Sequence, residues 1–366
     1  MCVWPATFDS ANLFLLCFLR LPSQLDTSRL HRPLPTPPKE KKIMTATRID
    51  VHLEPGWWRT TLEHDVRTGL LADQRSIPAK WFYDELGSQL FDDITKLDEY
   101  YPFRAERDIL ATRASEIIAA AEADTLVELG SGTSEKSRVL LDAMAVADGL
   151  KRYVPFDVSE EMLRSAADQI AADYPGTVVH GIVGDFDRHI PLVPIGGTGM
   201  VALLGSTIGN FEPTARKRFI ADVVAALEPG GTFLLGTDLV KDTDRLWAAY
   251  NDAQGVTAQF NLNMLTMINR ELNADFDLDR FEHAADWDAK NEWIDIRLRS
   301  KVAQTVRVRD LDLVVDFAAG EEMKTEISAK FRLKGIAGEL EAAGLAVVAH
   351  WTDDARDFAM TLARKR

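Results

Sequence analysis

From Thr125 onward the sequence alternates between short apolar runs and helical segments, and a turn containing Gly or Asp follows each run. The runs cover residues 126–129, 153–156, 178–183, 200–204 and 232–235. Short, mostly apolar runs of this length, with helices such as 134–147 and 160–172 between them, are typical of a parallel sheet covered on both faces. Such sheets bind ligands where strands end at the carboxyl edge, near the reversal of winding. We therefore expect functional residues directly after each run.

The loop after the first run contains two glycines, Gly130 and Gly132, and opens a helix. Glycine lets the backbone turn tightly beside a ligand, and a helix N-terminus offers free N–H groups to a carboxylate or phosphate. A dinucleotide fingerprint requires Gly or Ala at the sixth position, and a phosphate loop requires Gly before its lysine. Glu135 occupies both positions, so a hydride-transfer enzyme and a nucleoside triphosphatase are disfavoured.

The next strand ends carry residues that suit an adenosine ligand. Asp157 can accept hydrogen bonds from both hydroxyls of a ribose, or it caps the helix that starts near Ser159. Asp185 and Phe186 offer an acid and a ring to an adenine, and the small residues 205–209 leave room for a reacting group. Together these strand ends predict a site for S-adenosylmethionine.

The remaining segments have a different character. Aromatic residues cluster at 81–83 and at 99–102, where we expect Pro102 to end one helix before another begins at 104 and runs to 121. Residues 241–330 form an insertion with a helix through Tyr250, a helical stretch at 263–271 and two candidate antiparallel strands, 293–302 and 304–308. A helix at 336–343 and strands at 345–351 and 357–363 predict a closing antiparallel hairpin at the sheet edge.

Composition excludes several other classes. The net charge of −15 disfavours nucleic acid as a partner, because phosphate binding needs clustered Lys and Arg. The seven histidines are scattered without the spacing of metal ligands, so we expect no metal. The apolar run 13–19 is too short to cross a bilayer. Both cysteines, Cys2 and Cys17, lie near the start of the sequence, which fits a protein of the reducing cytoplasm. The sequence contains no heptad pattern long enough for a coiled coil, so we expect a monomer.

The proline-rich and charged stretch before residue 44 predicts that residues 1–43 are a disordered extension. Met44 is then the functional start, or the extension is a flexible leader.

With these motifs the chain resembles the class I S-adenosylmethionine-dependent methyltransferases. More narrowly, it is similar to the histidine-specific methyltransferases that form hercynine (N,N,N-trimethylhistidine) in ergothioneine biosynthesis. The resemblance covers nearly all of residues 44–366 and includes the blocks Lys80-Trp-Phe-Tyr-Asp, Leu129-Gly-Ser-Gly-Thr-Ser-Glu-Lys136 and Phe317-Ala-Ala-Gly-Glu-Glu-Met323. It implies trimethylation of the α-amino group of L-histidine by a soluble, cytoplasmic enzyme.

The resemblance also implies which residues form the site. The methyl donor would be held by Gly130, Lys136, Asp157, Asp185 and Phe186, with Gly205 lining its pocket. Lys136 would pair with the carboxylate of the donor. The amino-acid end of the substrate would lie among Tyr83, Tyr100, Asn210 and Tyr250, and its imidazole would meet Glu326 and Ser328. Ile296 would stand where the family has a methionine.

Two candidates could provide the free amine that a direct displacement requires, namely Tyr83 or a water held by Asn210. The expected architecture is a Rossmann-like doubly wound α/β domain with a closing hairpin, plus a mixed α+β domain for the substrate. The donor-binding domain would comprise residues 106–240 and 331–366, and the substrate-binding domain residues 44–105 and 241–330. The alternatives are a methyltransferase for another amino acid or small amine, and a donor-binding protein without catalysis.

Overall fold

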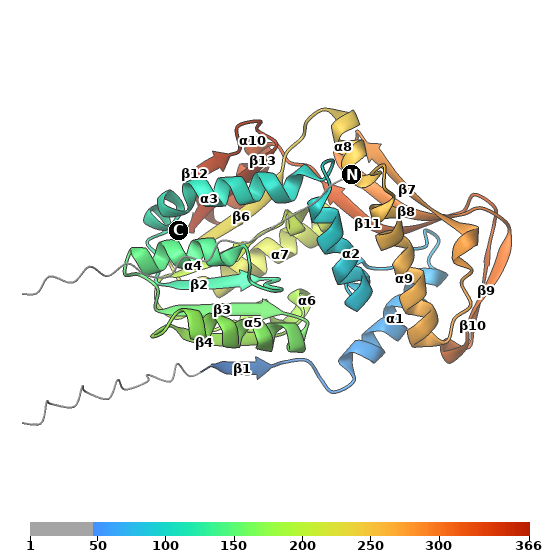
Figure 1. Cartoon of the computed structure of the whole chain (residues 1–366), viewed down its shortest axis with the longest axis horizontal. Helices are drawn as coiled ribbons and strands as arrows, with labels where there is room; N and C mark the ends of the chain where they lie inside the picture. The colour runs from blue at the N-terminus through green and yellow to red at the C-terminus, as the bar shows by residue number, and fades with distance from the viewer. Residues whose placement is uncertain (1–46) are drawn as a thin grey trace, which may run out of the picture. The chain divides into compact units, whose positions relative to one another are not determined.

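The computed structural model describes residues 47–366 (Figure 1). The expectations for residues 1–43, for the two cysteines and for the apolar run 13–19 lie outside the described residues. Within residues 47–366, no helix is both long and apolar enough to cross a membrane.

An eight-stranded sheet forms the centre of the fold, in the order β1-β4-β3-β2-β5-β6-β13-β12. Its strands are β1 (Arg48–Val51), β2 (Thr125–Leu129), β3 (Arg152–Asp157), β4 (Val178–Val183), β5 (Gly199–Leu203), β6 (Thr232–Asp238), β12 (Leu345–Thr352) and β13 (Phe358–Lys365). Strands β1 to β6 are parallel, and β13 runs antiparallel to both β6 and β12. The predicted parallel sheet and closing hairpin are therefore confirmed, whereas β1 is an additional edge strand.

Helices cover both faces of this sheet because neighbouring strand residues point to opposite sides. Leu126 and Tyr153 pack with α3 (Tyr101–Ala121), α4 (Ser137–Val146) and α5 (Glu160–Asp173). Val127 and Val154 pack on the other face with α7 (Pro213–Ala226) and α10 (Leu333–Ala342). The winding reverses between β2 and β5, so the ends of these two strands are the expected place for a ligand.

Two smaller antiparallel sheets belong to the second part of the fold. One has the order β11-β8-β7 and the other pairs β10 with β9. The strands are β7 (Phe281–Asp288), β8 (Trp293–Ser300), β9 (Gln304–Val308), β10 (Leu313–Phe317) and β11 (Glu322–Ala329). The two candidate strands at 293–302 and 304–308 are present and antiparallel, but they belong to different sheets, because β8 lies between β7 and β11 while β9 pairs with β10.

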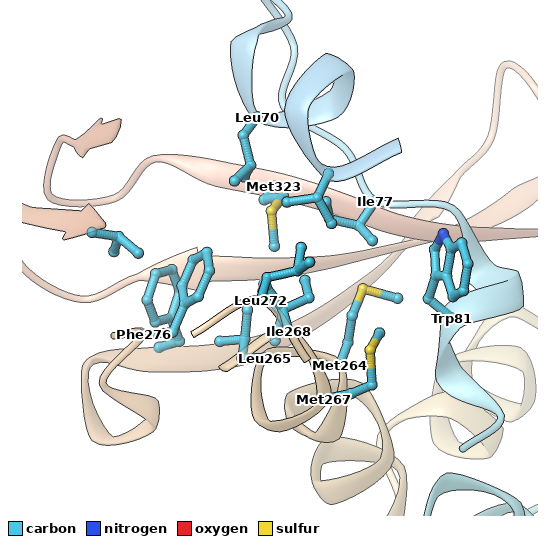
Figure 2. Packing of buried hydrophobic residues seen from close by; sticks show 14 of the residues in the cluster. Leu70, Ile77, Trp81, Met264, Leu265, Met267, Ile268, Leu272, Phe276 and Met323 are labelled. Atoms are coloured by element: carbon cyan, nitrogen blue, oxygen red, sulfur yellow. The ribbon is translucent and has the colours of Figure 1, made fainter. Parts of the chain in front are cut away.

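Most of the longer helices of this part pack on the antiparallel sheets around one apolar cluster (Figure 2), whereas the helix that ends at Tyr250 packs on β7 and β8 in a smaller cluster. The longer ones are α1 (Trp57–Leu71), α2 (Glu85–Lys96), α8 (Thr243–Tyr250) and α9 (Val256–Leu272). Met264, Leu265 and Ile268 of α9 pack with Leu70 and Met323 in the larger cluster. Short helical turns complete the described chain: η1 (Ala79–Phe82), α6 (Phe186–His189), η2 (Ile190–Leu192), η3 (Thr207–Asn210), η4 (Leu278–Arg280) and η5 (Arg309–Leu311).

The two parts meet where β11 leaves its own sheet. Phe331 donates a backbone hydrogen bond to Asp238 and accepts one from Val240, at 2.8 and 3.0 Å. These bonds align the end of β11 with the end of β6. Side chains from β11 therefore lie beside the carboxyl edge of the parallel sheet.

Pro102 begins a helix rather than ending one. Helix α2 ends at Lys96, and α3 starts at Tyr101 with Pro102 in its first turn. Proline is tolerated there because the first N–H groups of a helix have no partner inside it. The start at Tyr101, three residues earlier than expected, places Tyr100 and Tyr101 against the second part of the fold.

Candidate active site

The loop after β2 has the geometry of a ligand cradle. Gly130 and Gly132 both have positive φ, at 70° and 50°. A Cβ on Gly130 would lie 3.3 Å from the ring of Phe186, so glycine keeps the space between the two loops open. The Asp157 carboxylate accepts backbone hydrogen bonds from Gly132 at 2.8 Å and Ser159 at 2.9 Å. Asp157 thus fixes the loop and caps the next turn, while burial raises the pKa of its carboxyl.

Phe186 and Asp185 follow β4 at the same edge. The Phe186 ring is half-buried and stacks on Phe156 with centroids 5.5 Å apart. The Asp185 carboxylate lies 4.0 Å from the Lys80 ammonium of η1. The Asp185 carboxylate is therefore approached by an element from the second part of the fold, beside a flat ring that rests on β3.

Lys136 is held by a buried carboxylate. Glu106 of α3 is fully buried and accepts hydrogen bonds from the Lys136 ammonium and from the Gly205 backbone N–H, both at 2.7 Å. A Cβ on Gly205, whose φ is 75°, would lie 3.3 Å from the Lys136 nitrogen. Glu106 therefore brings the loops after β2 and β5 together. The positive-φ glycines and the partly exposed Lys136 fit the amino-acid end of S-adenosylmethionine.

Asn210 ends η3 and reaches across to β11. Its side-chain amide donates a 2.9 Å hydrogen bond to Glu326. The approach is close because Gly209 lies against Ala329, and a Cβ on Gly209 would stand only 2.8 Å from the Ala329 carbonyl oxygen. Glycine at this position therefore lets η3, which follows β5, lie close enough for Asn210 to reach the side chains of β11.

Three tyrosines from separate segments gather beside Glu326. Tyr83 and Tyr100 both contact the Phe91 ring edge-to-face, and Tyr100 contacts Tyr250 in the same way at 6.2 Å. Tyr83 is 47% exposed, so it borders solvent. The protein that packs around the rest of the residue removes part of the hydration of its phenol, and with the nearby Glu326 this raises the pKa of Tyr83. At neutral pH Tyr83 therefore acts as an uncharged hydroxyl.

A β-bulge in β11 selects the side chains that face this site. The register with β8 shifts between Lys324 and Glu326, which leaves Thr325 as the extra residue. After the bulge, Glu326 pairs with Ile296 and Ser328 pairs with Ile294 on one face. Burial raises the pKa of Glu326 to about 7, although Lys330 opposes the rise. This carboxyl can therefore change its protonation near neutral pH.

A buried charged cluster lies behind Ser328 and Tyr250. Lys330 bonds to the hydroxyls of both residues at 2.8 Å and pairs with Asp238 at 2.9 Å. Asp238 also accepts from the Tyr101 hydroxyl and pairs with Lys241. Burial favours the neutral acid, but the two lysines outweigh it and lower the pKa of Asp238. The cluster fixes the hydroxyls of Ser328 and Tyr250 in one arrangement.

The predicted residues fall into two groups that meet at one edge. Gly130, Lys136, Asp157, Asp185, Phe186 and Gly205 lie at the ends of the parallel strands, and Tyr83, Tyr100, Asn210, Tyr250, Glu326 and Ser328 surround the face of β11. The sequence interpretation missed Glu106, Asp238 and Lys330. The spacing Glu326, Ser328, Lys330 indicates one strand face and is the signal that identifies Lys330.

Within residues 47–366, no three His, Cys, Asp or Glu side chains are arranged to hold a metal ion.

Comparison with known proteins identifies the kind of site. Residues 62–365 match the family model described as histidine-specific methyltransferase, SAM-dependent. The chain is 57% identical to the histidine N-alpha-methyltransferase of Mycolicibacterium smegmatis, over 82% of this chain and 94% of that protein. It is 51% identical to the protein of the same name from Mycobacterium tuberculosis, over 86% and 98% of the two chains. It is also 34% identical to ergothioneine biosynthesis protein 1 of Neurospora crassa, over 53% of this chain and 23% of that protein.

Proposed function

Because the chain belongs to the family of histidine-specific, S-adenosylmethionine-dependent methyltransferases, we propose that it trimethylates the α-amine of L-histidine to form hercynine, the first step of ergothioneine biosynthesis. The enzyme class and the donor follow from family membership. The number of methyl groups, the residue roles and the domain boundaries are parts of the proposal.

The observation that carries the proposal is the hydrogen bond between Asn210 and Glu326. Asn210 belongs to the loop that begins at Gly205, beside the proposed donor contacts, and Glu326 belongs to the proposed imidazole contacts. Methyl transfer is a direct displacement that needs its reacting atoms about 3 to 3.5 Å apart and in line. A direct bond between the two groups of side chains supports such an arrangement.

S-adenosylmethionine supplies a methyl group that its positive sulfur makes electrophilic. The residues that would hold it are Gly130, Asp157, Asp185 and Phe186 at the adenosine end, and Lys136 and Gly205 at the amino-acid end. In this proposal Lys136 exchanges part of its contact with Glu106 for the carboxylate of the donor. Gly205 provides room for the donor beside the Lys136 ammonium.

The acceptor amine would lie between Asn210 and the three tyrosines. An α-amine is mostly protonated near neutral pH, so the site must bind the free base or remove a proton. The raised pKa of Tyr83 argues against a phenolate base, and we assign its neutral hydroxyl the role of orienting the amine. Asn210 would hold the amine or a water that receives its proton. The faces of the tyrosine rings would favour the quaternary cation that trimethylation creates.

Selection of histidine would come from Glu326 and Ser328. Both lie on the site face of β11, and Ile296 opposite Glu326 adds an apolar wall. In this proposal the Glu326 carboxylate accepts the ring N–H, and Ser328 serves the other ring nitrogen. Buried polar partners penalise a substrate that cannot satisfy them. An amino acid with an apolar side chain would leave both groups unpaired.

We further propose that residues 44–105 and 241–330 form the substrate-binding domain, and that residues 106–240 and 331–366 form the donor-binding domain. The separate apolar cluster around α9 supports this division. The acceptor is a small molecule, and we expect a cytoplasmic monomer. Light scattering during chromatography would test the last point, and a dimer mass would contradict it.

The test is a methylation assay with a panel of free amino acids, read by mass spectrometry. We expect histidine to gain three methyl groups on its α-nitrogen while the other amino acids remain unchanged. Methylation of another amino acid or of a small amine instead would support the second candidate, a methyltransferase with a different acceptor. Donor binding without any methylated product would contradict both.

A further inference from the structure

Lys330 has no unused hydrogen-bond donor. Its side chain is fully buried, and an ammonium group has three N–H donors and no acceptor. Its nitrogen bonds to the Tyr250 hydroxyl at 2.8 Å, to the Ser328 hydroxyl at 2.8 Å and to the Asp238 carboxylate at 2.9 Å. All three donors are therefore committed within the protein, so Lys330 acts on a substrate only through its partners.

A single hydrogen bond joins the hydroxyls of Tyr250 and Ser328, so one of them donates and the other accepts. Their oxygens lie 2.7 Å apart, and each already accepts a hydrogen bond from Lys330. A phenol is a stronger acid than an aliphatic alcohol, so it is the better donor, and Tyr250 donates to Ser328. The Ser328 oxygen then accepts two hydrogen bonds, which occupy both of its lone pairs. Its own O–H remains free, and Ser328 can only donate to a substrate.

We propose that Lys330 is a positioning residue that makes Ser328 an obligate hydrogen-bond donor and thereby restricts the acceptor pocket to an uncharged imidazole ring. This inference rests on the proposed function, in which the imidazole lies between Glu326 and Ser328. A neutral imidazole has one N–H and one nitrogen lone pair. Glu326 accepts the first, and the Ser328 hydroxyl donates to the second.

An imidazolium does not match this pattern. It carries two N–H groups, and the second would face an oxygen whose lone pairs are both occupied. The buried Lys330 ammonium adds a repulsive positive charge, and its influence reaches Glu326, whose pKa it lowers against the effect of burial. Other charged groups near the pocket are Asp238 and Lys241, which pair with each other and so compensate in part. The Glu326 carboxylate, by contrast, attracts an imidazolium and offsets this repulsion. The occupied lone pairs of Ser328 therefore decide which protonation state of the substrate is favoured.

The first experiment uses the wild-type enzyme. Histidine labelled with ¹⁵N in its ring is bound together with S-adenosylhomocysteine, which carries no methyl group to transfer, and its nitrogen shifts are followed by NMR. We expect one protonated and one unprotonated ring nitrogen, and this pattern should persist to at least about one pH unit below the normal histidine pKa of about 6.5. A bound ring protonated on both nitrogens at pH 7 would overturn the proposal.

The second experiment compares histidine with a pyrrolylalanine, which keeps one ring N–H but has carbon in place of the second nitrogen. The isomer that the wild type methylates faster is used. We expect wild-type kcat/KM to favour histidine by about 100-fold or more, because the analogue leaves the Ser328 hydroxyl unpaired. Lys330→Met should reduce this preference at least about tenfold, because Ser328 regains a free lone pair and can turn its hydrogen elsewhere.

Two further variants separate positioning from general damage. Ser328→Ala should reduce the preference as Lys330→Met does, and the double variant should reduce it no further than Ser328→Ala alone. Lys334→Met replaces an exposed lysine on α10 and should leave the preference unchanged. If Lys330→Met does not fold, the NMR result on the wild type still decides the proposal.

The outcomes distinguish this inference from the function on which it rests. A wild type that does not methylate histidine refutes the proposed function. A wild type that methylates histidine, combined with a folded Lys330→Met that keeps the full preference over pyrrolylalanine, refutes only the role of Lys330.

Discussion

Asn210 and Glu326 lie 116 positions apart in the sequence and share a 2.9 Å hydrogen bond at the meeting point of the two parts of the fold. The bond depends on backbone proximity, because Gly209 lies against Ala329 with no room for a side chain. The distance between the proposed donor and acceptor contacts is therefore set by packing of η3 on β11. Several testable consequences arise from this arrangement and from the charges around it.

Replacing Gly209 with alanine should separate η3 from β11. The new Cβ would stand 2.8 Å from the Ala329 carbonyl oxygen, so the loop must shift and Asn210 must move away from Glu326. We expect kcat/KM for histidine to fall by about 10- to 100-fold, since small misplacements of reacting groups are costly. Gly338→Ala, at a helix position with open space, should preserve activity and stabilise the fold by about 0.5–1 kcal/mol. Full activity of Gly209→Ala would contradict the argument.

Lys136→Met should weaken donor binding and reduce stability together. The change removes the proposed partner of the donor carboxylate and leaves the buried Glu106 with only the Gly205 N–H. We expect the free energy of unfolding to fall by about 2 kcal/mol, and calorimetric titration should show weaker S-adenosylmethionine binding. Lys151→Met, which breaks an exposed ion pair with Asp124, is the matched control and should leave donor affinity intact. Equal S-adenosylmethionine affinity in the two variants would show that Lys136 does not bind the donor.

Glu326→Gln should change how stability depends on pH. The pKa of Glu326 rises from 4.5 when unfolded to about 7 in the fold, so the native state holds its proton over this interval while the unfolded chain releases it. Wild-type stability therefore loses up to about 3 kcal/mol as the pH rises from 4.5 to 7. The glutamine variant lacks this loss and can still accept the Asn210 hydrogen bond. Urea unfolding at several pH values should show the variant gaining on the wild type as pH rises, and a constant difference would contradict the raised pKa.

Tyr83→Phe should reduce activity without destabilising the fold, because the ring keeps its contacts with Phe91 and Phe260. Loss of the orienting hydroxyl should lower kcat/KM for histidine by about tenfold. Since the pKa of Tyr83 lies well above its usual value, wild type and variant should have pH–rate profiles of the same shape up to pH 10. Tyr174→Phe, which removes the hydroxyl that bonds to Asp142, is the control. A rise in kcat/KM at high pH that is present in the wild type and absent from Tyr83→Phe would instead indicate a phenolate base.

The parallel sheet could be predicted because its strands are buried on both faces. Residues 126–129 and 178–183 are mostly apolar, with Glu128 and His180 as exceptions, and directly precede ligand-type turns, so the strands and the turns after them follow from one pattern. The closing hairpin followed from the stop at Gly344, which has a positive φ of 97°. The strand ends at which the proposed donor contacts lie could therefore be located from the sequence.

The second part of the fold could not be predicted in the same way. Strand β11 alternates polar and apolar residues like an ordinary half-buried strand, so Glu326 and Ser328 occupy positions that the pattern assigns to solvent, and nothing local marks them as site residues. Strand β1 has only four residues and no apolar run. The acceptor residues came from family resemblance rather than from any local pattern.

The sequence also did not reveal which charged residues are buried. Glu106 is indistinguishable in the sequence from a charged residue on a helix surface, and the spacing that places Lys330 on one strand face with Glu326 and Ser328 does not show that Lys330 is buried. Their burial depends on partners that lie far away along the chain, namely Lys136 for Glu106 and Asp238 for Lys330. Only the three-dimensional fold brings these partners together.

The bulge at Thr325 makes β11 a strand with two separable halves. Before it, Met323 faces the apolar cluster around α9, and after it, Glu326 and Ser328 lie at the proposed acceptor site. The extra residue, Thr325, separates residues 326–329, which include the proposed substrate contacts, from residues 322–324, which include the buried Met323. If the proposed acceptor contacts are correct, exchanging side chains after the bulge should change which amines are methylated, while Met323 and its neighbours keep the strand in place.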